Sequence, residues 1–181
     1  MKIRQAANLV EMFDTYTEDG RYLGREARSV VHREGIWHRT VNVLLFNGNG
    51  ELLLQQRSAK KDVCPLHWDL SVAEHLQPGE SDEVAAARGL LEELGLVDVP
   101  LAPVGETIRT RLELPERNIR DFEMTRCFRG VSDQVPRPDP DEVVAIEYVS
   151  VQTLVSELGA ESRCFTPWFV SLMDELGDAV S

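Results

Sequence analysis

The chain has few cysteines, little positive charge and no long hydrophobic run, and each shortage excludes a class of protein. Three cysteines, an odd number without metal-ligand spacing, favour reduced thiols in a cytoplasmic protein over a disulfide framework. The net charge of −12 argues against nucleic acid polymers and anionic membranes as partners, because both attract basic surfaces. Apolar runs such as 43–46 are far shorter than the roughly 18 residues that a membrane-spanning helix requires. The N-terminus also lacks the pattern of a signal peptide.

The length and the ordinary apolar content predict one globular domain over residues 1–181. Asp19-Gly20 is a hairpin signal, so residues 1–35 are expected to hold an N-terminal hairpin and a connection that ends at Gly35. Residues 39–46 and 51–57 are expected to form a second hairpin, followed by a polar loop over 58–67.

A helix is predicted from about Ser81 to Leu94. Ser81 or Asp82 can cap its first turn, and Gly95 suits the left-handed position after its end. The helical spacing of its apolar side chains predicts a core face made of Val84, Ala87, Leu91 and Leu94.

Further short segments complete the expected fold. Strands are predicted at 71–75, 103–112, 119–129 and 143–149, and helices at 151–158 and 167–176, so that residues 150–181 carry C-terminal helices. Hairpins with interspersed helices indicate an α/β sandwich on a mixed sheet rather than a doubly wound parallel fold.

The predicted helix at 81–94 concentrates negative charge. Glu92 and Glu93 are adjacent and follow Arg88 by four and five residues, so they repel each other unless a cation is present. Oxygen-rich sites of this kind suit hard divalent cations, which often bring a phosphate group. The alternative interpretation is a solvated acidic helix face.

The spacing resembles the Nudix box, G-x5-E-x7-R-E-U-x-E-E-x-G-U, in which U is a bulky aliphatic residue. Two positions depart from the box: Glu74 replaces its first glycine and Gly89 replaces the glutamate after the arginine. The resemblance implies a Nudix fold, an α/β/α sandwich in which residues 74–96 form a loop-helix-loop that binds Mg2+ or Mn2+ and a diphosphate. The matching residues are Glu80, Arg88, Leu90, Glu92, Glu93, Gly95 and Leu96.

This resemblance implies roles for the matching residues. Glu80, Glu92 and Glu93 would bind the metal ion. Arg88 is interpreted as a structural partner of Glu80, and Gly95 as a structural residue.

A wider resemblance points to the isopentenyl-diphosphate isomerase branch of the superfamily. It rests on the stretch from His32 to Asp62, on WDLSV at 68–72 and on FTPWF at 165–169. It implies that Arg57 and Lys61 contact the diphosphate, although they also suit an ordinary charged loop. It further implies that His75 is a metal ligand, for which a structural histidine is the alternative.

Asp121 and Glu123 match an acidic pair of the isomerase site, although surface alternation along a strand also explains them. The isomerases have two upstream histidine ligands, separated by one residue more than His32 and His38 are here. A structural role is therefore favoured for His32 and His38.

Ala73 stands where the isomerases carry a catalytic cysteine. A methyl group cannot exchange a proton, so this residue argues against isomerase chemistry. We therefore expect a metal-dependent hydrolase that cleaves a diphosphate linkage, such as that of a nucleoside diphosphate derivative.

In that hydrolase Glu92 and Glu93 would be catalytic, with Glu123 or Glu74 replacing the carboxylate missing at Gly89. The alternatives are an isomerase-like enzyme and a Nudix domain that binds a diphosphate without turnover. The expected partner is a small-molecule diphosphate, and a homodimer is a reasonable expectation.

Overall fold

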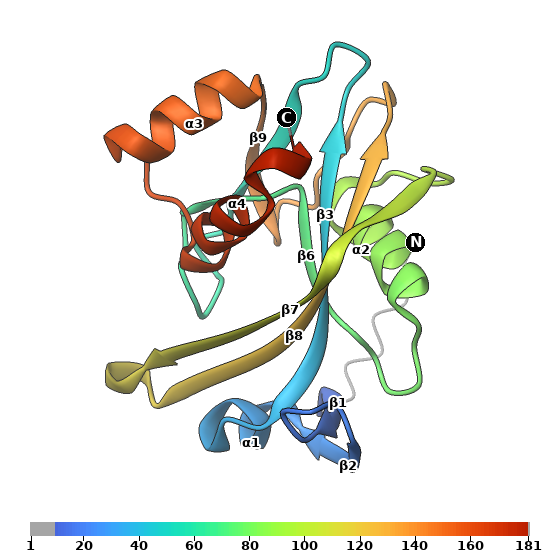
Figure 1. Ribbon diagram of the computed structural model, residues 1–181, viewed down its shortest axis with the longest axis vertical. Coiled ribbons are helices and arrows are strands. Elements are labelled where there is room, and N and C mark those ends of the chain that lie inside the picture. The colour runs from blue at the N-terminus through green and yellow to red at the C-terminus, as the bar shows by residue number, and fades with distance from the viewer. Residues whose placement is uncertain (1–9, 181) are drawn as a thin grey trace.

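The computed structural model describes residues 10–180, with side chains described through residue 176. Within these residues, nine strands form one sheet (Figure 1). The strands are β1 (Met12–Tyr16), β2 (Tyr22–Ala27), β3 (Trp37–Phe46), β4 (Leu52–Arg57), β5 (Trp68–Asp69), β6 (Val72–His75), β7 (Leu101–Leu114), β8 (Ile119–Val131) and β9 (Val143–Val149). The helices are α1 (Arg28–Glu34), α2 (Asp82–Leu94), α3 (Val151–Ala160) and α4 (Pro167–Val180), with a short 3-10 turn η1 (Pro115–Arg117).

Strand β3 is the centre of the sheet. It pairs in antiparallel fashion with β1, β4 and β6 and in parallel with β8, which makes the sheet mixed. The expected hairpin of β3 and β4 forms, but its strands pair only at Phe46 and Leu52. Beyond that pair, β6 takes the place beside β3, and β4 pairs with β9 and β5 instead.

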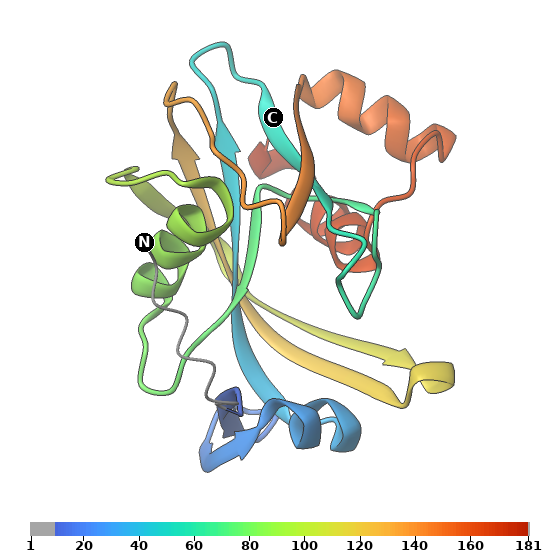
Figure 2. The same cartoon turned by 180° about the vertical axis from the view of Figure 1, so that it is seen from behind.

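Helices cover both faces of the sheet. Helix α2 packs on a buried cluster that includes Val41, Val43 and Leu53, whereas α3 and α4 pack on a second cluster that includes Leu44 and Phe46. Figures 1 and 2 show α2 on one side of β3 and the pair α3–α4 on the other. The predicted α/β/α sandwich is confirmed.

Helix α2 begins and ends as predicted. The Ser81 hydroxyl accepts a hydrogen bond from the Val84 amide at 3.4 Å, and Gly95 has a φ of 66°. The predicted core face is confirmed only at Leu94, because Val84 and Leu91 are 57% and 52% exposed and Ala87 is exposed as well. The residues of α2 that are buried are Ala85, Ala86, Gly89, Leu90, Glu93 and Leu94.

The close approach of α2 to β6 explains this difference. A Cβ atom on Gly89 would lie 2.5 Å from Val72 Cγ1, so only glycine fits between the helix and the strand. The helix thus turns its smallest side chains to the sheet, and Val84 and Leu91 face outward.

The N-terminal part contains the predicted hairpin, β1 and β2, and the short helix α1, which ends at Gly35 with a φ of 67°. Residues 1–9 of the predicted N-terminal unit lie outside the described residues. Strands β7 and β8 form a long ribbon that extends beyond the body of the molecule and lies beside α1 (Figure 1).

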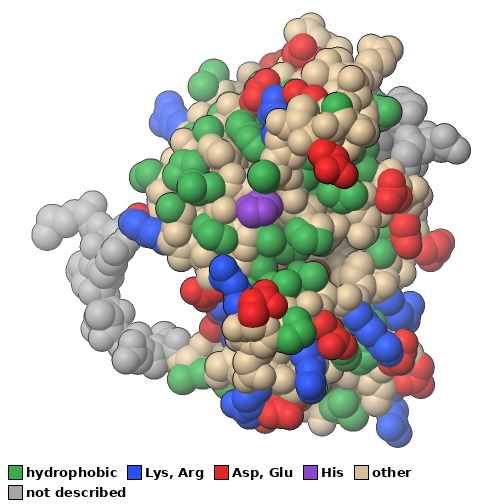
Figure 3. Space-filling view, turned by 90° about the vertical axis from the view of Figure 1, so that its left-hand side faces the viewer, with side chains coloured by type: hydrophobic (Ala, Val, Ile, Leu, Met, Phe, Trp, Pro, Cys, Tyr) green, Lys and Arg blue, Asp and Glu red, His purple; other side chains and the backbone are tan. Residues whose placement is uncertain are grey.

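None of the helices within residues 10–180 combines the length and the apolar character needed to cross a membrane. Figure 3 shows acidic and basic side chains intermixed on the lower half of one face, without a continuous basic surface there. This distribution agrees with the net charge of −12.

Candidate metal centre and adjoining cavity

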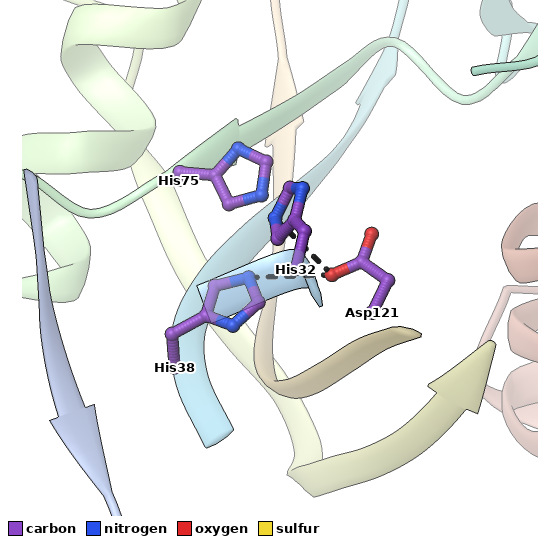
Figure 4. Close-up of side chains that lie close together, drawn as sticks. All are labelled: His32, His38, His75 and Asp121. Carbon is purple, nitrogen blue, oxygen red and sulfur yellow. Dashed lines mark ion pairs between the residues drawn. The ribbon is translucent and has the colours of Figure 1, made fainter. Parts of the chain in front are cut away.

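Four side chains from four different elements converge at the N-terminal end of β3. His32 comes from α1, His38 from β3, His75 from β6 and Asp121 from β8, and we call these four residues the histidine cluster (Figure 4). Each offers one ligand atom, and these atoms all lie within 4.8 Å of one another. Sheet register produces the convergence, because β6 and β8 both pair with β3 near His38.

The facing atoms of the histidine cluster lack hydrogen-bond partners. The Nε2 atoms of the three histidines and Oδ1 of Asp121 are all buried without one. The contacts of Asp121 Oδ1 with His32 Nε2 and His38 Nε2, at 3.5 and 3.4 Å, are ion-pair distances rather than good hydrogen bonds. Unpaired buried polar atoms are unfavourable, whereas a bound cation would satisfy all four.

The surroundings fix the orientation of the imidazole rings. The Ile36 carbonyl lies 3.1 Å from His38 Nδ1, so that nitrogen carries the proton and Nε2 keeps a free lone pair. The buried ring of Phe13 stacks on His38 at 5.0 Å and on His75 at 4.7 Å between centroids. Backbone and aromatic contacts thus hold the rings ready to bind a metal ion.

Burial keeps the histidines neutral. It lowers the pKa of His32 to about 3 and that of His38 to about 4, and it lowers the pKa of His75 well below its usual value. Neutral imidazole is the form that binds a metal ion. Burial also raises the pKa of Asp121 to about 6, against the opposing effect of Arg28.

Glu123 lies directly beside the histidine cluster. Its Oε1 is 3.6 Å from His75 Nε2, and burial, followed by the charge of Asp121, raises its pKa well above the usual value. Glu123 is therefore placed either to join the ligand set or to hold a proton next to it.

A cavity of about 570 Å³ opens beside the histidine cluster. Of the predicted site residues, Arg57, Lys61, His75, Glu92, Glu93 and Glu123 line it, as do Ala73, Glu74, Asp121 and Trp168. Glu80 is absent from its wall. Arg57, Lys61, part of the box helix α2 and two residues of the histidine cluster, His75 and Asp121, thus share one cavity.

Arg88 of the box helix contacts three carboxylates, one on β6, one before α2 and one on α2 itself. It contacts Glu80 through two hydrogen bonds of 2.9 Å, Glu74 at 3.0 Å and Glu92 at 3.3 Å. Its Nη2 also donates to the His75 carbonyl at 2.8 Å. Arg88 thereby ties α2 to the end of β6, and the metal-binding roles predicted for Glu80 and Glu92 remain predictions.

Glu93 differs from its neighbours because it is buried. Its Oε2 accepts a hydrogen bond from Gln55 Nε2 at 2.7 Å, and burial raises its pKa to about 8. Glu92, by contrast, has a side chain that is 56% exposed. The two adjacent glutamates therefore meet different environments, and both reach the cavity.

Glu74 occupies the space that a side chain at position 89 would need. A Cβ atom on Gly89 would lie 3.3 Å from Glu74 Cβ and 3.6 Å from its Cγ. The two departures from the Nudix box are thus spatially linked: the strand gains a carboxylate where the helix loses one.

Arg57 is the last residue of β4, and Lys61 lies four residues later in the loop that connects β4 to β5. Arg57 Nη1 contacts Asp69 Oδ2 at 3.3 Å, and its Nε and Nη2 donate to the Val63 carbonyl at 3.3 and 3.1 Å. Lys61 Nζ pairs with the Glu142 carboxylate. An anion in the cavity would compete with Glu142 for Lys61, whereas Arg57 is held in place by Asp69 and the Val63 carbonyl.

Sequence reasoning favoured structural roles for His32 and His38, yet the structure places both in the histidine cluster. The resemblance to the isomerases was the signal that pointed to them, and only their spacing argued against it. The connection between α1 and β3 turns at Gly35, so a gap shorter by one residue still lets both rings point to one centre.

Comparisons with known proteins agree with this fold. The model of the NUDIX domain family matches residues 36–169, and the chain belongs to that family. Within it, the chain belongs to the branch of the Nudix-fold isopentenyl-diphosphate isomerases.

Curated relatives support that placement. A protein of Nocardia farcinica named isopentenyl-diphosphate Delta-isomerase is 39% identical over 171 residues, which cover 94% of each chain. A protein of Streptomyces griseus with the same name is 34% identical over 170 residues, 93% of this chain and 85% of that one. A third, from Pectobacterium atrosepticum, is 34% identical over 152 residues, 84% of this chain and 83% of that one.

Solved structures show the same fold. A Deinococcus radiodurans crystal structure superposes with a TM-score of 0.73 at 23% identity and covers 91% of this chain and 98% of that one. The MutT protein of Methanosarcina mazei gives 0.63 at 21% identity, over 79% of this chain and 94% of that one.

These relatives correct the functional expectation drawn from the sequence. The expected hydrolase of a nucleoside diphosphate derivative is contradicted, because the curated relatives carry the name of an isomerase. The expectation rested on Ala73 and set aside the histidine pair His32 and His38, which the fold brings to the candidate metal centre.

Proposed function

We propose that the protein is a metal-dependent isomerase of a short isoprenoid diphosphate, of the isopentenyl diphosphate type. The observation that supports this proposal is the histidine cluster, whose members His75 and Asp121 line the same cavity as Glu123, Arg57 and Lys61. The names of the similar proteins supply the substrate class.

The metal ion would be held by His32, His38, His75 and Asp121, beside the Glu123 carboxyl group. The buried, unpaired ligand atoms fit such an ion. Of the two expected ions, Mn2+ suits this nitrogen-rich set better than Mg2+, which prefers oxygen ligands. When bound, the ion supplies positive charge that fixes the carboxylates and lowers their proton affinity.

The anionic end of the substrate would bind at Arg57 and Lys61. Arg57 and Lys61 provide fixed positive charge there, and both line the cavity. Glu92 and Glu93 lie nearby and would hold a second divalent cation together with the diphosphate, as the Nudix box resemblance implies.

The proton transfer requires a group other than residue 73. Ala73 lines the cavity but has no exchangeable proton. We assign the transfer to the Glu123 carboxyl group, which would protonate the terminal alkene carbon and then, as a carboxylate, remove a proton from the carbon on the other side of the resulting cation. The double bond moves by one position and no atom is lost.

The test is to incubate the Mn2+-loaded protein with isopentenyl diphosphate in D2O and follow deuterium uptake and dimethylallyl diphosphate by NMR. We expect conversion by the wild-type protein and loss of roughly 100-fold or more in Glu123→Gln, the scale of a missing general acid–base group. Absence of conversion by the metal-loaded wild type would refute the isomerase proposal.

Ala73 favours a second candidate, a domain that binds an isoprenoid diphosphate without turning it over. In that case the wild-type protein would bind the substrate in calorimetry but leave it unchanged. Ala73→Cys is the matched variant, because it restores the side chain that the resembling isomerases carry. Activity that appears only in Ala73→Cys would favour the binding domain over the enzyme.

A further inference from the structure

The carboxylate of Asp69 lies behind the cavity wall and is completely buried. Four donors surround it. The Thr166 hydroxyl donates to Oδ1 at 2.9 Å, the Trp168 indole Nε1 lies 2.9 and 3.0 Å from the two oxygens, and the Asp69 Oδ1 also accepts from the Leu70 amide at 2.9 Å. Arg57 Nη1 is the fourth donor, at 3.3 Å from Oδ2. A buried charge is tolerated only when it is paired in this way.

Two of these donors belong to residues that line the cavity, Arg57 and Trp168. They also contact each other, because the Arg57 guanidinium carbon lies 5.0 Å from the centroid of the Trp168 ring. Asp69 is absent from the cavity wall, so its contact with any ligand is indirect.

The bonds of Arg57 leave part of its guanidinium free. A guanidinium has five N–H groups, and three of them are used by Asp69 and the Val63 carbonyl. The remaining donors are available to an anion in the cavity, and the fixed fork suits phosphate oxygens.

We propose that Asp69 is a positioning residue that fixes Arg57 and Trp168 as one paired wall, with a rigid cation for the diphosphate and a rigid aromatic face beside it. Asp69 holds the guanidinium through Nη1 and the indole through Nε1, so neither side chain can rotate without breaking a bond to a buried carboxylate. The inference rests on the proposed function for the identity of the ligand, whereas the pairing itself stands on the contacts.

Asp69→Asn is the direct test, because it keeps the shape and replaces one acceptor oxygen by a donor. The probe is inorganic pyrophosphate with Mn2+, measured by calorimetry on the full-length protein. We expect the affinity to fall about tenfold or more, which is the loss of one charge-assisted hydrogen bond to a ligand-binding arginine. With isopentenyl diphosphate, KM should rise by a similar factor while kcat changes less than about threefold, since Asp69 touches no reacting atom.

A double-mutant cycle separates positioning from general damage to the fold. If Asp69 acts through Arg57, then Asp69→Asn should add less than about a twofold loss of pyrophosphate affinity in an Arg57→Met background. Losses that multiply across the two variants would overturn the proposal, as would unchanged affinity in Asp69→Asn. Asp174→Asn, an exposed residue on the same helix as Trp168, is the matched control for the change in charge.

Thr166→Val provides the milder variant if Asp69→Asn does not fold. Thr166 donates to the same carboxylate and is absent from the cavity wall, so a loss of about two- to fivefold in pyrophosphate affinity is expected. No loss in a folded Thr166→Val protein would count against the proposal. A wild-type protein that binds pyrophosphate without isomerising isopentenyl diphosphate would refute the proposed reaction and leave the role of Asp69 supported. A wild-type protein that does not bind pyrophosphate would overturn the role of Asp69.

Discussion

The two candidate metal-binding regions around the cavity differ in whether their side chains already have partners. In the histidine cluster, four ligand atoms face one another without hydrogen-bond partners. On the box helix, Arg88 already contacts Glu74, Glu80 and Glu92, and Gln55 binds Glu93. The first region leaves its ligand atoms open to a bound cation, whereas in the second Arg88 and Gln55 already contact the carboxylates.

This difference shows why a motif match and a metal site need not coincide. The Nudix box marks where carboxylates are spaced along a helix, but the state of each carboxylate depends on what packs against it. The buried atoms without partners lie outside the box except for His75, which falls within residues 74–96. Four variants can break or sharpen the comparison.

The largest effect is expected from His75→Ala. Loss of one imidazole ligand should lower the affinity for Mn2+ by more than about 100-fold. Removing a residue that only hydrogen-bonds to a metal ligand costs up to about 100-fold, and removing the ligand itself should cost more. Metal content after gel filtration and calorimetry with Mn2+ measure it. Glu80→Gln is the matched control and should keep its metal. The reverse pattern would place the tightly bound ion at the box helix.

Glu93→Gln tests the buried glutamate of the box helix. Burial raises the pKa of Glu93 to about 8, with Glu74 and Asp69 acting in the same direction and Gln55 and Lys61 opposing it. Between the unfolded pKa of 4.5 and about 8, the folded state holds a proton that the unfolded state has lost, so stability falls as the pH rises through this window.

The metal-free Glu93→Gln protein should therefore be more stable than the wild type at pH 8, by roughly 2–4 kcal/mol, and similar to it near pH 5. Urea unfolding in EDTA at the two pH values measures the difference. Glu92→Gln, at a mostly exposed position, should show no such dependence. A wild-type stability that stays level between pH 5 and pH 8 would contradict this account.

Gly89→Ala tests the close contact between α2 and β6. Alanine usually stabilises a helix, but here its Cβ would lie 2.5 Å from Val72 Cγ1. We expect a loss of about 1–3 kcal/mol from overpacking. Gly159→Ala is the matched control in α3, where nothing lies within 4 Å, and it should gain about 0.5–1 kcal/mol. Thermal or urea unfolding distinguishes them, and a stabilised Gly89→Ala would show that the helix moves freely from the strand.

The smallest effect is expected from Phe13→Leu. Phe13 stacks on His38 and His75, so a smaller, non-aromatic side chain should cost about 1 kcal/mol of stability. Unfolding with and without Mn2+ measures it. The deficit should shrink when the metal is bound, because the ion then fixes the rings. An equal deficit in both conditions would limit Phe13 to a packing role.

Local features of the fold were predictable because they depend on neighbouring residues. The bounds of α2 follow from Ser81 and Gly95, and the N-terminal hairpin follows from Asp19-Gly20. The buried face of α2 was not predictable in this way, because the spacing of its apolar residues pointed to Val84 and Leu91. The contact of Gly89 with Val72 decides the face, and that contact joins a helix to a strand.

Part of the candidate site was likewise predictable from the sequence, and part was not. Arg57, Lys61, His75, Glu92, Glu93 and Glu123 were picked from the sequence, and all six line one cavity. His32 and His38 were set aside on their spacing alone. The number of residues between two ligands does not determine whether their side chains meet, because a helix and a left-handed glycine lie between them.

The sequence by itself determined the Nudix fold and the residue types that reach the cavity, because turn signals, capping residues and box spacing are local. Only the tertiary structure decided which of these residues lack a partner. Pairing β6 and β8 on either side of β3 brings His32, His38, His75 and Asp121 together with their ligand atoms unpaired. In the same fold, Arg88 pairs with Glu80 and Glu92 and Gln55 donates to Glu93, so the three carboxylates that the motif had marked for the metal already have partners.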